Sequence, residues 1–308
     1  MPKIKIVLLI IIIGIFLGGC QVDDYYYDKS KINIVTTTAI IADLARNIGQ
    51  EKVHVYELMG PGIDPHSYNA TAGDIRKIQQ ADLVIFNGLH LEGKMEKVFS
   101  NLDKIDKNYL EIGAHYTMDE LIYLEDQAVD PHIWFSVTLW KKAATLVCEK
   151  LQDMDPENFD YYLDNKNKYF TQLNELDLFI REEISKIPEQ SRVLITAHDA
   201  FNYFGREYGF EVIGLQGLSS LDEAGIKRIS ELAEFIVKRE IKAIYIENSV
   251  PVKTVQALQK AVLSRGFNVK IGGELYSDSL GNKNTIEGTY IGAYKANIIA
   301  IVGGLKDE

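Results

Sequence analysis

The residues with the clearest chemistry lie in two copies of one short motif. The tripeptide Asp-Pro-His ends at His66 in GPGIDPHSYNA and again at His132 in AVDPHIWFS, in a chain of 308 residues with six histidines. Proline fixes its own φ and pushes the preceding residue to an extended conformation, so each histidine leaves a stiff turn that can present a nitrogen to a metal ion. We expect Asp64 and Asp130 to cap nearby backbone amides, or to accept the N–H of a ligand imidazole and set its tautomer.

Two more candidate ligands follow predicted strands in the C-terminal half of the chain. His198 ends RVLITA in TAHDAF, and Asp278 follows NVKIGGEL in YSDSLG. Because ligands of open parallel sheets bind beyond the carboxyl ends of the strands, we expect these two residues to converge with the two motif histidines. Three imidazoles and one carboxylate suit Zn²⁺ and are tolerated by Mn²⁺, so the sequence predicts a site for one ion and leaves the choice of metal open.

Other residues that could take part in metal chemistry are more ambiguous. Glu247 in YIENS ends a predicted strand on the side of the same cleft, where it can accept the N–H of a ligand imidazole or cap the next turn of the chain. We expect His54 and His90 to have packing or surface roles. Cys148, in LWKKAATLVCEKL, is predicted to be a small buried helix residue.

The elements that must position these residues alternate between strands and helices. In residues 32–154 the pattern predicts strands at 32–38, 53–59, 82–88 and 108–113, with helices at 40–49, 72–80, 93–102 and 137–151. In residues 189–308 it predicts strands at 191–197, 210–216, 242–248 and 268–275, with helices at 200–209, 222–240, 252–266 and 286–305. Strands separated by helices form parallel βαβ units, so we expect an α/β fold with two (βα)4-type lobes, each with a four-stranded parallel sheet.

Residues 155–188 are predicted to form a single long rigid helix that joins the two lobes. After Pro156 the chain runs about 31 residues without Gly or Pro, with apolar and aromatic residues at helical spacing. At 1.5 Å per residue this helix would span roughly 45 Å. Such a helix resists a wide hinge closure, so we expect smaller, local motion of the loops in the C-terminal lobe.

The N-terminal residues predict export and lipidation. Two lysines and an apolar run too short to span a bilayer precede LGGC at residues 17–20, which is typical of a bacterial lipobox. We therefore assign residues 1–19 to a signal peptide, expect a lipid on Cys20 and treat residues 20–31 as the lipidated Cys and a tether. A transmembrane anchor that ends by chance at Cys20 is the alternative. With Cys20 lipidated, Cys148 is the one cysteine left, so no intrachain disulfide is possible.

The charge of the chain limits its partners. The formal net charge is −11, and it becomes −13 when the two lysines of residues 1–19 are removed. An acidic surface argues against nucleic acid and anionic lipid as partners, and it is compatible with a cationic cargo.

Together these motifs resemble the metal-binding lipoproteins of bacterial zinc and manganese ABC importers, the TroA/ZnuA/PsaA-like family. The matching stretches, in order, are LGGC, GPGIDPHSYNATAGDIRKIQQADLVIFNGLHLE, VDPHIWFS, TAHDAFNYFGREYGFEVIGLQGLSS, IYIENSVP and YSDSLG. They extend over nearly all of the mature chain. The resemblance implies two lobes joined by a rigid helix, with one metal ion in the cleft between them.

Carried over position by position, the resemblance implies a metal held by His66, His132, His198 and Asp278. Many manganese-dedicated relatives have Glu where this chain has His198, whereas the stretch NGLHLEGKM is closer to a mixed zinc and manganese branch. The resemblance also implies a monomer that is lipid-anchored on the extracytoplasmic face of the cell membrane. Its partner would be the permease subunit of an ABC importer, and its cargo Zn²⁺ or Mn²⁺.

Two other functions are compatible with the motifs. One is a lipid-anchored metallohydrolase that uses three histidines with Glu247 or Asp278 as general base, and the other is an adhesin with a structural metal. Four protein ligands fill a tetrahedral site and leave no position for the water that a catalytic zinc activates. We therefore expect a carrier and not an enzyme.

Overall fold

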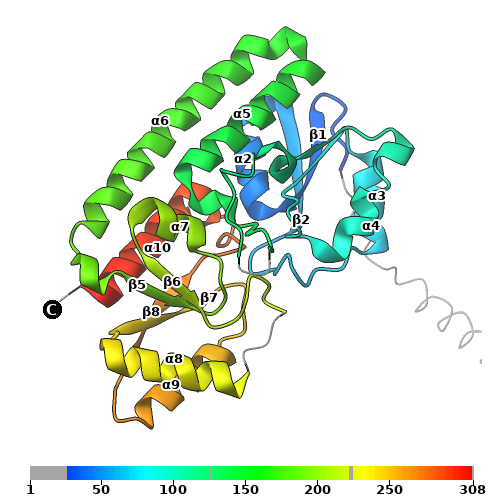
Figure 1. Cartoon of the computed structure of the whole chain (residues 1–308). Coiled ribbons are helices and arrows are strands. Elements are labelled where there is room, and N and C mark those ends of the chain that lie inside the picture. Colours follow the sequence, from blue (N-terminus) through cyan, green and yellow to red (C-terminus); the bar gives the residue numbers. More distant parts are fainter. Residues whose placement is uncertain (1–25, 125–126, 222–224, 307–308) are drawn as a thin grey trace, which may run out of the picture.

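The computed structural model describes residues 26–124, 127–221 and 225–306. The predicted signal peptide, Cys20 and the tether up to residue 25 lie outside the described residues. Among the helices that are described, none combines the length and the apolar character needed to cross a bilayer. The predicted fold class is confirmed: the chain is α/β, with parallel sheets in two lobes and one long helix between them (Figure 1).

The N-terminal lobe is built on a four-stranded parallel sheet with the order β2-β1-β3-β4. Its strands are β1 (Ile32–Thr38), β2 (Val53–Met59), β3 (Leu83–Phe86) and β4 (Tyr109–Glu111), and its helices are α2 (Ala39–Gly49), α3 (Ala72–Gln80), α4 (Glu96–Phe99) and α5 (Val137–Met154). Strand β1 is buried on both faces, which agrees with its β-branched sequence INIVTTT.

Local hydrogen bonds fix where two helices near the predicted ligands begin. The hydroxyl of Thr71 accepts a hydrogen bond from the Asp74 backbone N–H, and the Asp74 carboxylate accepts one from the Thr71 N–H, so α3 starts with a capping box. The hydroxyl of Ser136 accepts a hydrogen bond from the Leu139 N–H at the start of α5. Each cap fixes the chain a few residues after one Asp-Pro-His turn.

The predicted helix over residues 93–102 is shorter in the structure and begins as a 3₁₀ turn. A 3₁₀ turn covers Gly93–Met95, and α4 has four residues. The helix stops because the side chains of Ser100 and Asn101 both donate hydrogen bonds to the carbonyl oxygen of Lys97 and so replace the next turn. This competition between side chain and backbone is not visible in the apolar periodicity.

The lobes are joined by α6 (Phe159–Ile184), a helix of 26 residues that spans about 39 Å. It is shorter than the predicted segment 155–188, because Pro156 starts a separate 3₁₀ turn over Pro156–Asn158 and the helix ends before Pro188. One face of α6 is buried in a stripe along its whole length. Figure 1 shows α6 running beside α5 of the N-terminal lobe and α10 of the C-terminal lobe.

The C-terminal lobe contains four strands that pair in parallel. They are β5 (Val193–Thr196), β6 (Glu211–Gly214), β7 (Ala243–Glu247) and β8 (Lys270–Leu275), and the helices are α7 (Asn202–Tyr208), α8 (Ile226–Arg239), α9 (Lys253–Leu263) and α10 (Tyr290–Leu305). Hydrogen bonds join β5 to β6 and β7 to β8, so the strands that were expected in one sheet form two pairs. Strands β5 and β7 lie next to each other.

One hydrophobic core extends through both lobes. It includes Ile34 of β1, Leu173 of α6, Tyr245 of β7 and Ile298 of α10. A second cluster lies between the C-terminal strands and α8 and α9, and a third covers the other face of the N-terminal sheet. Because one face of α6 packs against both lobes, a wide rotation of one lobe against the other would expose buried apolar surface.

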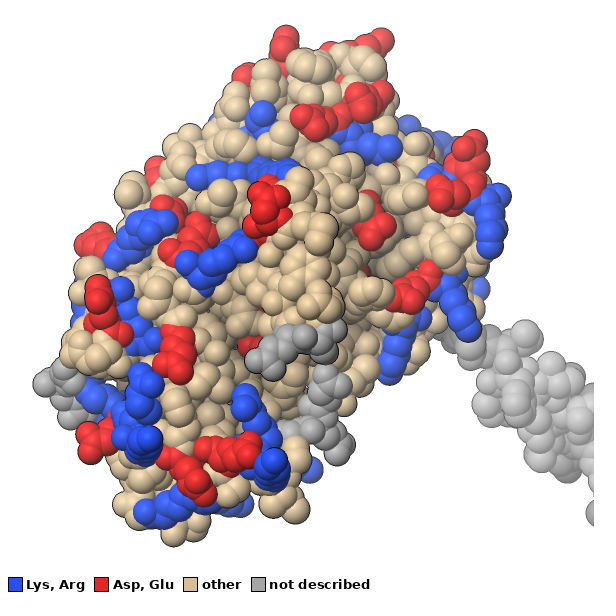
Figure 2. All heavy atoms as spheres, viewed as in Figure 1, with Lys and Arg blue, Asp and Glu red and all other residues tan. Residues whose placement is uncertain are grey.

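The described surface that faces the viewer in Figure 2 carries charges of both signs in close alternation. Some charged side chains pair within one helix, such as Arg181 with Asp177 in α6 and Lys227 with Glu231 in α8. Neither sign of charge forms a large separate patch on the described part of this face.

Candidate metal centre

Four loops bring the predicted ligands to one point between the lobes. His66 lies in the loop after β2, His132 lies just before α5, His198 follows β5, and Asp278 follows β8. His66 is 6% exposed, and each of the other three is at most 1% exposed. One ligand atom from each residue can be chosen so that all four atoms lie within 4.8 Å of one another. Two of the residues come from each lobe.

The spacing of these atoms fits a tetrahedral metal site. The distances from Nε2 to the nearest carboxylate oxygen of Asp278 are 3.7 Å for His66, 3.4 Å for His132 and 3.1 Å for His198. In a tetrahedron with bonds of about 2.0–2.1 Å from metal to ligand, two ligand atoms are about 3.3–3.4 Å apart. The three distances are close to this spacing, and the one to His66 is the longest.

The same atoms lack the partners that buried polar groups normally have. Among the described residues, no hydrogen bond of acceptable geometry reaches Nε2 of any of the three histidines or either carboxylate oxygen of Asp278. Burying a polar atom without a partner is unfavourable, and one metal ion would satisfy all four residues together. Three imidazole nitrogens and a carboxylate oxygen form a set that suits Zn²⁺ and is acceptable to Mn²⁺.

Asp130 holds the second Asp-Pro-His turn with both of its carboxylate oxygens. Oδ1 accepts the backbone N–H of His132 at 2.9 Å and lies 2.7 Å from Nδ1 of the same ring. Oδ2 accepts a hydrogen bond from the Asn202 side chain at 3.0 Å, and the Tyr203 hydroxyl donates to the Asp130 carbonyl oxygen at 2.8 Å. When Nδ1 donates to Asp130, Nε2 is free to bind a metal.

Glu247 supports His198 in a similar way. Its Oε1 accepts the backbone N–H of His198 at 2.9 Å, and its Oε2 lies 2.6 Å from Nδ1. Burial disfavours the charged imidazole, but the carboxylates of Glu247 and Asp278 raise the pKa of His198 well above its usual value. Burial also opposes ionisation of Asp278, yet the His198 ring and its neighbours hold the pKa of that carboxyl well below its usual range. In the metal-free protein these two residues therefore form an ion pair.

The first Asp-Pro-His turn is held by a different set of contacts. Asp64 Oδ1 accepts the backbone N–H of His66 at 2.9 Å, and Oδ2 accepts the hydroxyl of Ser220, from the other lobe, at 2.5 Å. Within the described residues, the one carboxylate that pairs with the His66 ring is Asp278. Burial lowers the pKa of His66 to about 4, against the opposing effect of Asp278. This ring is therefore neutral at pH 7.

Other contacts that fix the ligand loops were not predicted from the sequence. The hydroxyl of Ser279 accepts the N–H of Gly62 at 2.7 Å and so joins the loop of the acidic ligand to the first turn. The indole N–H of Trp134 donates to the carbonyl oxygen of Ser277 at 3.0 Å, and its ring lies edge-on to the second ligand histidine. The aromatic residue two positions after each motif histidine was a visible signal, whereas the contacts of the serines join distant parts of the chain.

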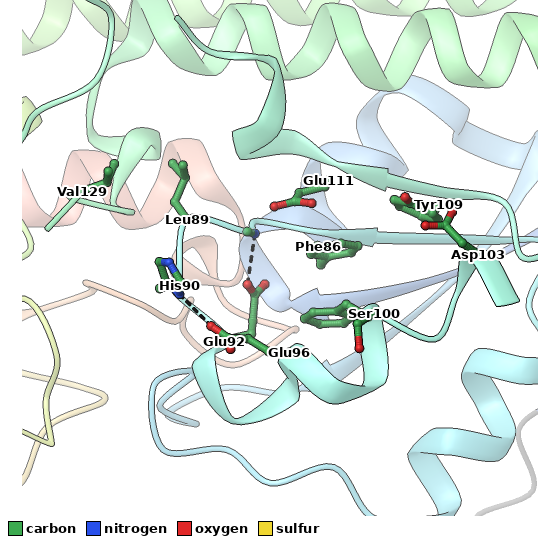
Figure 3. Close-up of a pocket in the computed structure, with 12 residues that line it drawn as sticks. Phe86, Leu89, His90, Glu92, Glu96, Ser100, Asp103, Tyr109, Glu111 and Val129 are labelled. Carbon is green, nitrogen blue, oxygen red and sulfur yellow. Dashed lines mark hydrogen bonds and ion pairs between the residues drawn. The ribbon is translucent and has the colours of Figure 1, made fainter. Parts of the chain in front are cut away.

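Two cavities lie near these loops. One, of about 350 Å³, is lined by His66 and by residues 217–219 of the C-terminal lobe. A larger cavity of about 540 Å³ lies at β3, β4 and α4, and none of the four candidate ligands lines it (Figure 3). His90 lines both cavities, is exposed, and pairs through Nδ1 with Glu96 at 2.6 Å. Neither His90 nor His54, which lies on β2, joins the ligand group.

A family model described as zinc-uptake complex component A, periplasmic (ZnuA), matches residues 34–304. This chain belongs to that family. The match covers both lobes, the long helix and all four candidate ligands, so the resemblance inferred from the motifs is confirmed.

Individual relatives agree with this assignment. The zinc-binding protein TroA of Treponema pallidum is 46% identical over 272 residues, which is 88% of each chain. The manganese-binding lipoprotein MntA of Bacillus subtilis is 42% identical over 292 residues, covering 94% of this chain and 95% of the relative. The solved structure of the periplasmic zinc-binding protein TroA of Treponema pallidum superposes with a TM-score of 0.88 at 45% identity, over 90% of this chain and all of that one.

Proposed function

We propose that this chain is a lipid-anchored, extracytoplasmic solute-binding protein that captures one Zn²⁺ or Mn²⁺ ion between its lobes and delivers it to the permease of an ABC importer. The observation that carries this proposal is the set of four buried ligand atoms without hydrogen-bond partners, within 4.8 Å of one another. The proposed ligands are His66, His132, His198 and Asp278.

The names of the relatives support the class of cargo and of partner. One relative is a zinc-binding protein and another a manganese-binding lipoprotein, and several more are named metal ABC transporter substrate-binding lipoproteins. The ligand set of this chain is compatible with both metals, so we propose that it binds either one. We propose a monomeric carrier, since the four ligands come from one chain.

The organisation of the chain fits this role. We propose a signal peptide at 1–19, the lipidated Cys20 with its tether at 20–31, an N-terminal lobe at 32–154, the linking helix at 155–188 and a C-terminal lobe at 189–308. Lipid on Cys20 would keep the carrier at the extracytoplasmic face of the cell membrane. Because α6 packs against both lobes, it resists rotation of one lobe against the other. Delivery of the ion to the permease would therefore use local motion of the loops.

A carrier fits the site better than the two alternatives. A hydrolytic zinc keeps one coordination position for water, whereas here four side chains each offer a ligand atom within 4.8 Å of the others, enough to fill a tetrahedral site. Asp130 and Glu247 contact ligand rings and backbone amides, which favours a positioning role over that of a general base. In an adhesin with a structural metal the ion would be needed for folding, so melting of the metal-free protein separates that function from a carrier.

A titration of the metal-free protein tests the proposal. We expect one Zn²⁺ or Mn²⁺ per chain in competition with a chelator, a folded protein before metal is added, and a melting temperature that rises with free metal by mass action. Unfolding on chelation would support a structural metal, and turnover of an ester or peptide substrate would support a hydrolase. Failure to bind either metal would refute the proposal.

A further inference from the structure

The first ligand histidine differs from the other two in its surroundings. His132 and His198 each have a carboxylate within 2.7 Å of Nδ1, and both are fully buried. His66 has no such partner among the described residues, lies farthest from Asp278, and lines the cavity of about 350 Å³ between the lobes. Of the three imidazoles, it is the one held least firmly and the one next to open space.

The position of the His66 turn depends on a contact with the other lobe. Asp64 accepts the His66 backbone N–H with one oxygen and the Ser220 hydroxyl with the other, at 2.9 Å and 2.5 Å. Both Asp64 and Ser220 are half-buried. Ser220 directly follows residues 217–219, which form the C-terminal wall of the same cavity. One carboxylate therefore connects the ligand turn to the opposite wall of the cavity.

We propose that the metal enters and leaves past His66 through this cavity, and that Ser220 is a positioning residue whose hydrogen bond to Asp64 holds this path closed. The inference rests on the proposed metal-binding function and extends it to the rate of exchange. Breaking the bond frees the first turn and the 217–219 wall to separate, while the contacts of Asp130 with His132 and of Glu247 with His198 stay in place. The metal affinity then changes less than the rates at which the metal enters and leaves.

Another contact of the first turn does not define the same path. The Gly62 N–H donates to Ser279, but Ser279 is adjacent to Asp278 and so belongs to the ligand loops themselves. Removing its hydroxyl would disturb two ligands together. Ser220, in contrast, directly follows the cavity-lining residues 217–219 and adjoins none of the four ligands in the sequence.

The test is metal release measured by stopped flow, with loaded protein mixed into an excess of chelator. Ser220→Ala removes the hydroxyl and is expected to speed release by about tenfold, as the loss of one hydrogen bond to a charged group predicts. Ser220→Thr keeps a hydroxyl and is expected to release metal at close to the wild-type rate. Ser219→Ala is the matched control. Ser219 lines the same cavity, but its hydroxyl accepts a hydrogen bond from the Leu221 N–H within its own loop.

The outcomes separate this inference from the proposed function. If the wild-type protein binds Zn²⁺ or Mn²⁺ and Ser220→Ala releases it at the wild-type rate, the inference is wrong and the function stands. Equal acceleration in Ser219→Ala, or no rescue by Ser220→Thr, would also overturn it, because the effect would then come from the loop and not from the bond. A wild-type protein that binds neither metal refutes both. Melting of the metal-free variants shows whether each one is folded.

Discussion

The two Asp-Pro-His turns share one tripeptide but are held in different ways. In the second turn Asp130 contacts both the backbone and the ring of His132, and two residues of α7 hold Asp130 in turn. In the first turn Asp64 contacts the backbone of His66 and then reaches across to the other lobe. The same motif therefore yields one rigid ligand and one ligand whose position depends on how the lobes meet.

The difference originates in the residues on the C-terminal side of each turn. After His132 the chain enters a buried 3₁₀ turn, Ile133–Phe135, and then α5, so the second turn is part of the shared core. After His66 the chain continues through partly exposed residues before α3 begins. Burial on all sides fixes the second turn, whereas a few hydrogen bonds position the first.

The largest expected effect concerns the aromatic residue after each turn. Trp134→Ala should lower the free energy of unfolding of the metal-free protein by about 3–5 kcal/mol, because it removes a buried ring from the core. Tyr68→Phe, which removes a hydroxyl that donates to Asp74 at 2.7 Å, should lower it by about 1 kcal/mol. Urea denaturation measures both values. Equal losses would contradict the view that the core holds just the second turn.

Loss of a ligand ring should come next in size. His66→Ala and His132→Ala should each weaken metal affinity by more than about 100-fold, measured by chelator competition. Loss of a residue that only orients a ligand costs about 10–100-fold, and loss of the ligand itself should cost more. His132→Ala should also lower the melting temperature of the metal-free protein, because it leaves Asp130 buried without its ring partner. His90→Ala is the control and should bind normally. Full affinity in either ligand variant would remove that residue from the proposed site.

The supporting carboxylates allow a direct comparison of the two turns. Asp130→Asn should weaken affinity by about 10–100-fold, as for other groups that orient a ligand imidazole. Asp64→Asn should weaken it by less than about tenfold, because Asp64 does not contact the ring and its amide replacement still accepts the His66 N–H. Chelator competition ranks the two variants. The reverse order would mean that the first turn is the more tightly coupled to the metal.

Metal binding should depend on pH through His198 and not through the first turn. Buried His198 is protonated in the metal-free protein because Glu247 and Asp278 raise its pKa, so the metal must displace a proton. Affinity should therefore fall as the pH falls, by about tenfold per pH unit for one displaced proton. His66, with a pKa of about 4, is already neutral near pH 7 and so releases no proton when the metal binds. Calorimetry in buffers of different ionisation enthalpy counts the protons, and an affinity independent of pH would contradict this assignment.

The sequence predicted which four candidate ligands the structure would bring together, because their signals are local. A proline lies in each motif turn, and His198 and Asp278 follow the carboxyl ends of β5 and β8, which belong to two neighbouring parallel pairs. The contact of Asp64 with Ser220 could not be predicted, because 156 residues separate them and neither sits in a pattern that indicates pairing. The sequence left two roles open for Asp64 and Asp130, and the structure gives Asp64 one of them and Asp130 both.

The misplaced elements have the same origin. Apolar spacing predicted a helix over residues 93–102, but bonds from Ser100 and Asn101 to the backbone end α4 after four residues. Strand runs in the C-terminal half were correctly located, whereas their division into two pairs depends on pairing between distant segments. Periodicity indicates which face of an element is buried, but not which neighbour covers it.

The core that α6 shares with both lobes limits how the molecule can be divided. Neither lobe has a complete interior of its own, because α6 supplies side chains to the clusters around α5 and around α10. A chain cut after residue 188 would leave apolar surface exposed on both fragments, so neither should fold separately. The intact protein should instead unfold in one cooperative transition, and its lobes should not behave as exchangeable modules.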